Sequence, residues 1–161
     1  MTYSPGQSCL ADVFDYLVSM ATTAVTGAYT ELTVFDGYAG TNQPRNLVCI
    51  GGGPDDDEQS TVRDYVVLGN SGQNRLEQFD IPIYIRCWDG GLIVSGARRR
   101  AVTLFNLIEN AVRADPRLGG NISTHYPAQL TQMSLRQTPP ENARKGRSAS
   151  IRSAVTVKNR Y

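Results

Sequence analysis

Residues 79–118 read FDIPIYIRCWDGGLIVSGARRRAVTLFNLIENAVRADPRL, and the rest of the fold can be worked out from this stretch. Its first part alternates apolar residues with others, as a strand with one buried face does. Glycines at 90–91 predict a turn out of the strand. Pro82 cannot donate a ladder hydrogen bond, so we expect an edge strand or a proline nitrogen that points away from the ladder. The predicted core face is Phe79, Ile81, Ile83, Ile85 and Cys87.

A long helix is predicted after the turn, from Ser95 or Gly96 to the Asp115-Pro116 pair. Arg98, Arg99 and Arg100 fall in its first turn, where the helix dipole disfavours cations by roughly 0.3–1 kcal/mol each. Folding alone does not require that placement. The three arginines are therefore candidates for a functional surface, with a solvated charged face as the alternative. The apolar stripe of the helix is Ala97, Ala101, Leu104, Phe105, Ile108 and Val112.

Working outward, a first helix is expected from an N-cap at Ser8 to about Val25, followed by a glycine at 27 that favours its end. This order of elements predicts an α+β fold, with two main helices on a mostly antiparallel or mixed sheet of four to six strands. The predicted strands are residues 30–35, 46–50, 61–68, about 75–88, part of 121–138, and 149–158.

Two further features concern the end of the chain. In the segment 121–138, Leu130, Met133 and Leu135 are expected to contact the core. The last strand alternates apolar residues with residues such as Arg152 and Lys158, so its outer face is expected to be polar and basic.

The length of 161 residues predicts a single domain over residues 1–161, with loops near 51–60 and 138–147. No apolar stretch approaches the roughly 20 residues of a membrane span, and the first residues lack the basic and apolar parts of a signal peptide. We therefore expect no membrane partner. Cys9, Cys49 and Cys87 lie too far apart for a zinc or redox motif, and we expect them to be reduced and buried.

Charge is distributed unevenly along the chain. Up to residue 80 there are eleven acidic and three basic residues, whereas the remainder has thirteen basic and four acidic residues. If folding keeps these halves apart, opposite faces of two subunits would attract each other, which suits head-to-tail assembly into a ring. The basic part could alternatively face a polyanion such as DNA.

The sequence offers little for catalysis. Glycines at 51–53 follow a predicted strand but lack the lysine of a phosphate-binding loop, and aspartates follow them. His125 is the one histidine and is expected to be an ordinary loop or strand residue. We expect a protein that is not an enzyme and that uses no catalytic residue, metal or cofactor. The acidic run Asp55, Asp56, Asp57 and Glu58 is expected to be a loop that contacts another subunit, because adjacent carboxylates in an extended chain do not converge on one cation.

The predicted loop at 138–147 ends in Arg144, Lys145 and Arg147. Its polar, proline-containing composition favours either a solvated linker or an arm that reaches a neighbouring subunit or DNA phosphates. Aromatic residues are not interleaved with its basic residues, so base stacking is not indicated.

The element order and two segments, the strand ending IRCW and the helix ARRRAVTLFNLIENAVRADPRLGG, resemble the tail-terminator proteins of bacteriophages with long, non-contractile tails. The resemblance covers most of the chain and lies in element order and apolar spacing. It implies a structural virion protein, assembled in the host cytoplasm, that ends tail polymerisation and joins the tail to the head. Another head-to-tail joining or tail-completion protein, and a small nucleic-acid-binding module, are the alternatives.

The same resemblance implies the partners. They are further copies in a hexameric ring, the tail tube protein, a head-completion or connector protein, and genomic DNA that passes through the lumen without sequence specificity. The candidates for lumen or subunit contact are Arg98, Arg99, Arg100, Arg144, Lys145 and Arg147. The acidic run at 55–58 is not part of the resemblance.

Overall fold

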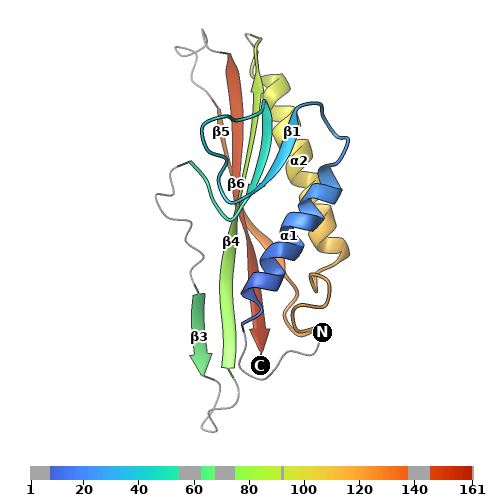
Figure 1. Ribbon diagram of the computed structural model, residues 1–161, viewed down its shortest axis with the longest axis vertical. Helices are drawn as coiled ribbons and strands as arrows, with labels where there is room; N and C mark the ends of the chain where they lie inside the picture. The colour runs from blue at the N-terminus through green and yellow to red at the C-terminus, as the bar shows by residue number, and fades with distance from the viewer. Residues whose placement is uncertain (1–7, 55–62, 68–74, 92, 138–145, 161) are drawn as a thin grey trace.

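The computed structural model describes residues 8–54, 63–67, 75–91, 93–137 and 146–160. In these ranges the chain forms two helices and one six-stranded sheet, an α+β fold as predicted (Figure 1). The elements are α1 (Leu10–Val25), β1 (Leu32–Asp36), β2 (Asn46–Ile50), β3 (Arg63–Val67), β4 (Arg75–Asp89), α2 (Ser95–Ala114), β5 (Gln129–Gln137) and β6 (Arg147–Arg160).

Strand β4 organises the sheet, whose order is β1-β2-β4-β6-β5, with β3 beside the first half of β4. It pairs with β6 along its whole length on one edge, and with β2 and β3 in turn on the other. All pairs are antiparallel except β1 with β2, which is parallel. The expectation of a mostly antiparallel or mixed sheet is confirmed.

The edge-strand alternative for Pro82 is wrong, because β4 is central, and the second alternative is confirmed. The carbonyl of Pro82 accepts a hydrogen bond from the Gly51 N–H at 2.7 Å, immediately after β2 ends. The N and C=O of one strand residue point to the same side, so the nitrogen of Pro82 also points toward the β2 edge. It lies in the interval between the β2 and β3 pairings, where no donor is required.

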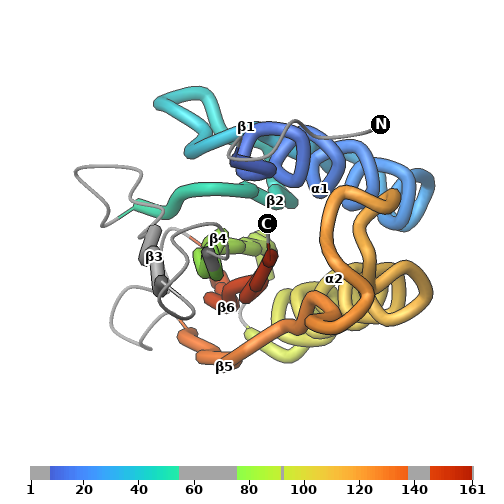
Figure 2. Tube along the Cα trace, turned by 90° about the horizontal axis from the view of Figure 1, so that it is seen from below, coloured from blue at the N-terminus to red at the C-terminus, as the bar shows by residue number. Residues whose placement is uncertain are grey.

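Both helices cover one face of the sheet, α1 over the side of β1 and β2 and α2 over the side of β6 and β5 (Figure 2). The predicted core face of β4 is confirmed, since all five of its residues are at most 2 % exposed. The predicted stripe of α2 is buried as well. Side chains of β6 that alternate with its polar ones complete this core: Ala149, Ile151, Val155 and Val157.

Helix α1 ends at Val25 as predicted, but its N-cap is Cys9 and not Ser8. The hydroxyl of Ser8 donates to the carboxylate of Glu77 at 2.6 Å and accepts from the Leu10 N–H at 3.1 Å. Glu77 is fully buried at the start of β4. Because a buried carboxylate needs donors, Ser8 is held against the sheet rather than in the capping position.

The opposite face of the sheet is partly covered by the connection between β1 and β2. Here Ala39 and Tyr38 pack against Leu47, Cys49 and Tyr84, which point away from the helices. The Gly37 N–H donates to the carbonyl of Ile50 at 2.7 Å, which holds the start of this connection beside the end of β2.

Strand β5 carries a β-bulge, and one prediction made for it is wrong. The pairing with β6 shifts between Thr131 and Ser134, and Gln132 has a φ of 57°. As a result Met133 is 51 % exposed instead of contacting the core, while Leu130 and Leu135 pack against the core as expected.

The three cysteines are free and buried, as expected. Burial raises the pKa of the Cys9 thiol to about 11, with a further contribution from Glu77, and raises that of Cys87 to about 12. Among the described residues, neither helix has the length and apolar composition that crossing a bilayer requires.

Candidate functional site

The fold brings two groups of predicted residues to the same end of the molecule. Strand β4 ends there at Asp89, α2 begins with Arg98, Arg99 and Arg100 in its first turns, and β6 begins at Arg147. Arg147 lies opposite Asp89 in the β4–β6 register. We call this region the basic end.

Asp89 anchors the basic end. Its carboxylate lies 3.0 Å from the guanidinium of Arg100, and the same guanidinium donates to the carbonyl of Trp88 at 3.1 Å. The carboxylate also accepts from the Gly91 N–H at 3.0 Å. The Gly91 N–H, followed by Arg100, holds the pKa of Asp89 below its ordinary value. Arg100 is therefore a structural residue that ties α2 to the end of β4.

Arg98 and Arg99 differ from Arg100 because both are exposed. Arg98 donates to the side-chain carbonyl of Gln137, at the end of β5, at 3.1 Å. The first turn of α2 contains no acidic residue, and its N-cap, Val94, offers no side-chain cap. The positive end of the helix dipole thus adds to the charge of these arginines.

Trp88 connects the basic end to β2. The guanidinium of Arg45 lies 5.4 Å from the centroid of its ring, within the range of a cation–π contact. Arg45 also pairs with Glu31 at 3.1 Å. On the other side, Gly146 packs so closely that a Cβ there would lie 2.5 Å from the indole.

The sheet face opposite the helices is basic, and only part of it was predicted. Arg152 and Lys158 lie on it as expected for the outer face of the last strand. The register adds Arg86 of β4 and Arg136 of β5, which both lie opposite Ser150 of β6. Alternation along β4 could have indicated Arg86, whereas Arg136 depends on the register after the bulge. The guanidinium of Arg152 lies 5.8 Å from the Tyr84 ring.

Folding keeps the charge imbalance of the sequence as two opposite flanks. Helix α1 and strands β1 and β2 contain Asp12, Asp15 and Asp36 and no basic residue. Helix α2 and strands β5 and β6 contain nine basic residues and one acidic residue, Glu109. In the strand order, β4 separates β1 and β2 from β6 and β5 (Figure 2). The elements of one flank therefore contain acidic residues, and those of the other contain mainly basic ones. We call them the acidic flank and the basic flank.

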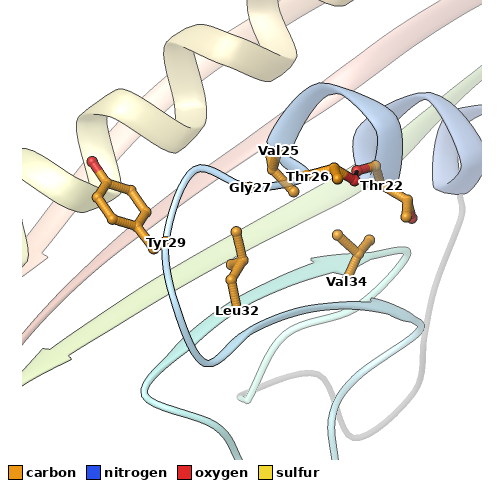
Figure 3. Close-up of a pocket in the computed structure, with 7 residues that line it drawn as sticks. All are labelled: Thr22, Val25, Thr26, Gly27, Tyr29, Leu32 and Val34. Atoms are coloured by element: carbon orange, nitrogen blue, oxygen red, sulfur yellow. Dashed lines mark hydrogen bonds between the residues drawn. The ribbon is translucent and has the colours of Figure 1, made fainter.

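The acidic flank contains a hollow of about 210 Å³ between the last turns of α1 and strand β1. Leu32 and Val34 of β1 point from below toward Thr22 and Val25 of α1 (Figure 3). The hydroxyl of Thr22 donates to the carbonyl of Val18 at 2.8 Å. Its donor is therefore used within the helix, and the lining of the hollow combines polar surface with the apolar side chains of Val25, Leu32 and Val34.

The remaining predicted residues carry no described site. Asp55, Asp56, Asp57, Glu58, Arg144 and Lys145 lie outside the described residues. His125 is exposed, and its Nδ1 lies 3.3 Å from the Ser123 hydroxyl in the same turn. Within the described ranges no group of three His, Cys, Asp or Glu side chains could hold a metal.

No family model matches the sequence, and no curated protein does. Among solved structures, the chain is similar to one described as the virion of a native gene transfer agent particle. The alignment covers 98 % of this chain and 100 % of that chain, with 12 % identity and a TM-score of 0.39. A similarity at this level defines neither a family nor an activity.

Proposed function

We propose that the protein is a phage-type virion component, a tail terminator that caps the tail tube as a hexameric ring and joins it to the head connector. It works by assembly and surface complementarity, without catalysis. The sequence resemblance motivates this function. The observation that carries it is the separation of acidic and basic residues onto opposite flanks of one sheet.

Opposite flanks of unlike charge favour a head-to-tail contact, in which the basic flank of one copy meets the acidic flank of the next. Such a contact uses two different surfaces of each subunit, so it generates a ring if the rotation closes. In the proposed ring, exposed arginines of the basic end, including Arg98 and Arg99, face the lumen or a neighbouring subunit. DNA in the lumen is contacted through its phosphates, without sequence specificity.

The function is tested by deleting the gene from the genome that carries it and imaging the resulting lysates by electron microscopy. We expect DNA-filled heads without tails, beside tail tubes longer than normal, and rescue by the wild-type protein supplied in trans. Normal tailed particles in the deletion lysate would show that the protein neither ends nor joins tails.

A nucleic-acid-binding module is the second candidate, and the basic sheet face with Arg86, Arg136 and Arg152 favours it. This function predicts binding to duplex or single-stranded DNA by the isolated protein, with an affinity that falls steeply as salt rises. A titration with DNA of unrelated sequences at low and high salt separates it from the first. Tail defects in the deletion lysate without such binding favour the terminator.

A further inference from the structure

The two edges of the sheet carry complementary features besides charge. The acidic flank has the hollow between α1 and β1, whereas the basic flank has Met133 exposed on the bulge of β5. Strands β1 and β5 are the terminal strands of the path, so these features lie on opposite sides of the subunit. We propose that the hollow of one copy receives Met133 of the next copy. This inference rests on the ring assembly proposed above and names its contact.

Met133 has the properties of such an insertion. It is one of two large apolar side chains in the described residues that are mostly exposed; the other is Ile93, in the turn before α2. A left-handed φ at Gln132 builds the bulge that exposes it, and such conformations in non-glycine residues have a free-energy cost. Methionine is flexible and fits irregular apolar spaces.

The hollow has room for this occupant, and its floor is apolar although its rim is polar. Apolar cavities of about 150 Å³ hold a benzene-sized molecule, and this hollow has about 210 Å³. Its floor is formed by Leu32 and Val34, which are only partly buried within one subunit. Covering it removes apolar surface from water, at about 25 cal/mol per Å².

Charge orients the same contact. The hollow lies among elements that contain acidic but no basic residues, and Met133 lies on a strand whose one charged residue is the exposed Arg136. Contact between two acidic flanks or two basic flanks is disfavoured by repulsion. The contact is therefore heterologous and can be repeated from copy to copy.

Two single-surface variants test the proposal. Thr22→Arg places a long cation at the rim of the hollow, and Met133→Asp removes the inserting group and adds a negative charge; both positions are exposed. The matched controls are Thr23→Arg, one residue along the same helix and outside the hollow, and Ile93→Asp, at the other exposed apolar residue. Circular dichroism verifies that each variant is folded.

Sedimentation velocity over a concentration series is the readout. We expect wild type and both controls to assemble, less so as ionic strength rises from about 0.05 to 0.5 M, where screening increases severalfold. Thr22→Arg and Met133→Asp should each lose at least about tenfold in association constant, the effect of roughly 1.4 kcal/mol. Mixed in equal amounts, they should form at least a one-to-one heterodimer, because the intact Met133 of the Thr22→Arg variant meets the intact hollow of the Met133→Asp variant.

Three results overturn the inference. They are a wild-type protein that stays monomeric at every concentration and salt, a variant that assembles as well as its matched control, and a mixture that forms no heterodimer. The lysate experiment keeps the two proposals apart. If deletion produces overlong tails and both variants restore normal ones, the terminator function stands and this contact is wrong. If the heterodimer forms but deletion leaves tails normal, the contact stands and the function is wrong.

Discussion

The carboxylate of Asp89 forms a 3.0 Å ion pair with Arg100, and this pair fixes the start of α2 against the end of β4. The two side chains are 31 % and 30 % exposed. Arg147, the first residue of β6, lies opposite Asp89 in the register. Within the basic end, Arg100 is thus held in place by an acid, whereas Arg98 and Arg99 are exposed.

Replacing Asp89 with Asn should lower the free energy of unfolding near pH 7 by no more than about 1 kcal/mol, since the pair is partly exposed. The pKa of Asp89 is lower in the folded protein than its ordinary value of 3.8. The ionised carboxylate therefore adds its full contribution to the free energy of unfolding above pH 3.8, and this contribution is lost as the pH falls through the lower pKa of the folded state. Urea unfolding of both proteins should therefore differ at pH 7 and converge once the pH falls below the lowered pKa of Asp89. An equal difference at both pH values would contradict the assigned ionisation.

Gly146→Ala should destabilise the protein by roughly 1–3 kcal/mol, the usual cost of overpacking. Gly146 has a φ of 86°, and an added Cβ would meet the Trp88 ring at 2.5 Å. Trp88 is the one tryptophan, so a shift of its emission reports directly on this region. Gly40→Ala is the control, because a Cβ at that glycine has nothing within 4 Å. Equal stability of the two variants would argue against the close packing.

Tyr16→Phe should raise the pKa of Asp115 toward its ordinary value. The Tyr16 hydroxyl donates to the Asp115 carboxylate at 2.6 Å, and this hydrogen bond is the main cause of the lowered pKa. An NMR titration of the carboxyl group measures the shift, and unfolding should show a loss on the order of 1 kcal/mol. Tyr126→Phe is the control, since the Tyr126 hydroxyl makes no hydrogen bond to a described residue. If the pKa of Asp115 were the same in Tyr16→Phe as in the wild type, the hydrogen bond from Tyr16 would not be the cause of its lowered value.

The arginines of α2 should separate stability from function. Arg98→Gln with Arg99→Gln should not lower the melting temperature, because both side chains are exposed and their charges lie at the positive end of the helix dipole. The double variant should nevertheless reduce infectious particles in the complementation assay. Arg100→Gln should lower the melting temperature, because it breaks the pair with Asp89. Wild-type titres from the double variant would remove these arginines from the proposed lumen or subunit contact.

Much of the fold could be predicted because periodicity depends on local chain geometry. The alternation in β4 and the stripe of α2 each expose one apolar face to burial, and both were placed correctly. The position of β4 in the sheet could not be predicted in the same way, because Pro82 is compatible with an edge or with a gap between two partners. The structure has the gap, between β2 and β3.

The candidate site shows the same division. The sequence by itself determined which residues are apolar at regular spacing, the excess of acid before residue 80 and of base after it, and the unusual arginines at the start of α2. Only the tertiary structure decided that Arg100 is held by Asp89, that the bulge exposes Met133, and that the unlike charges lie on opposite flanks. These outcomes depend on strand order and register, which arise from contacts between residues far apart in the chain.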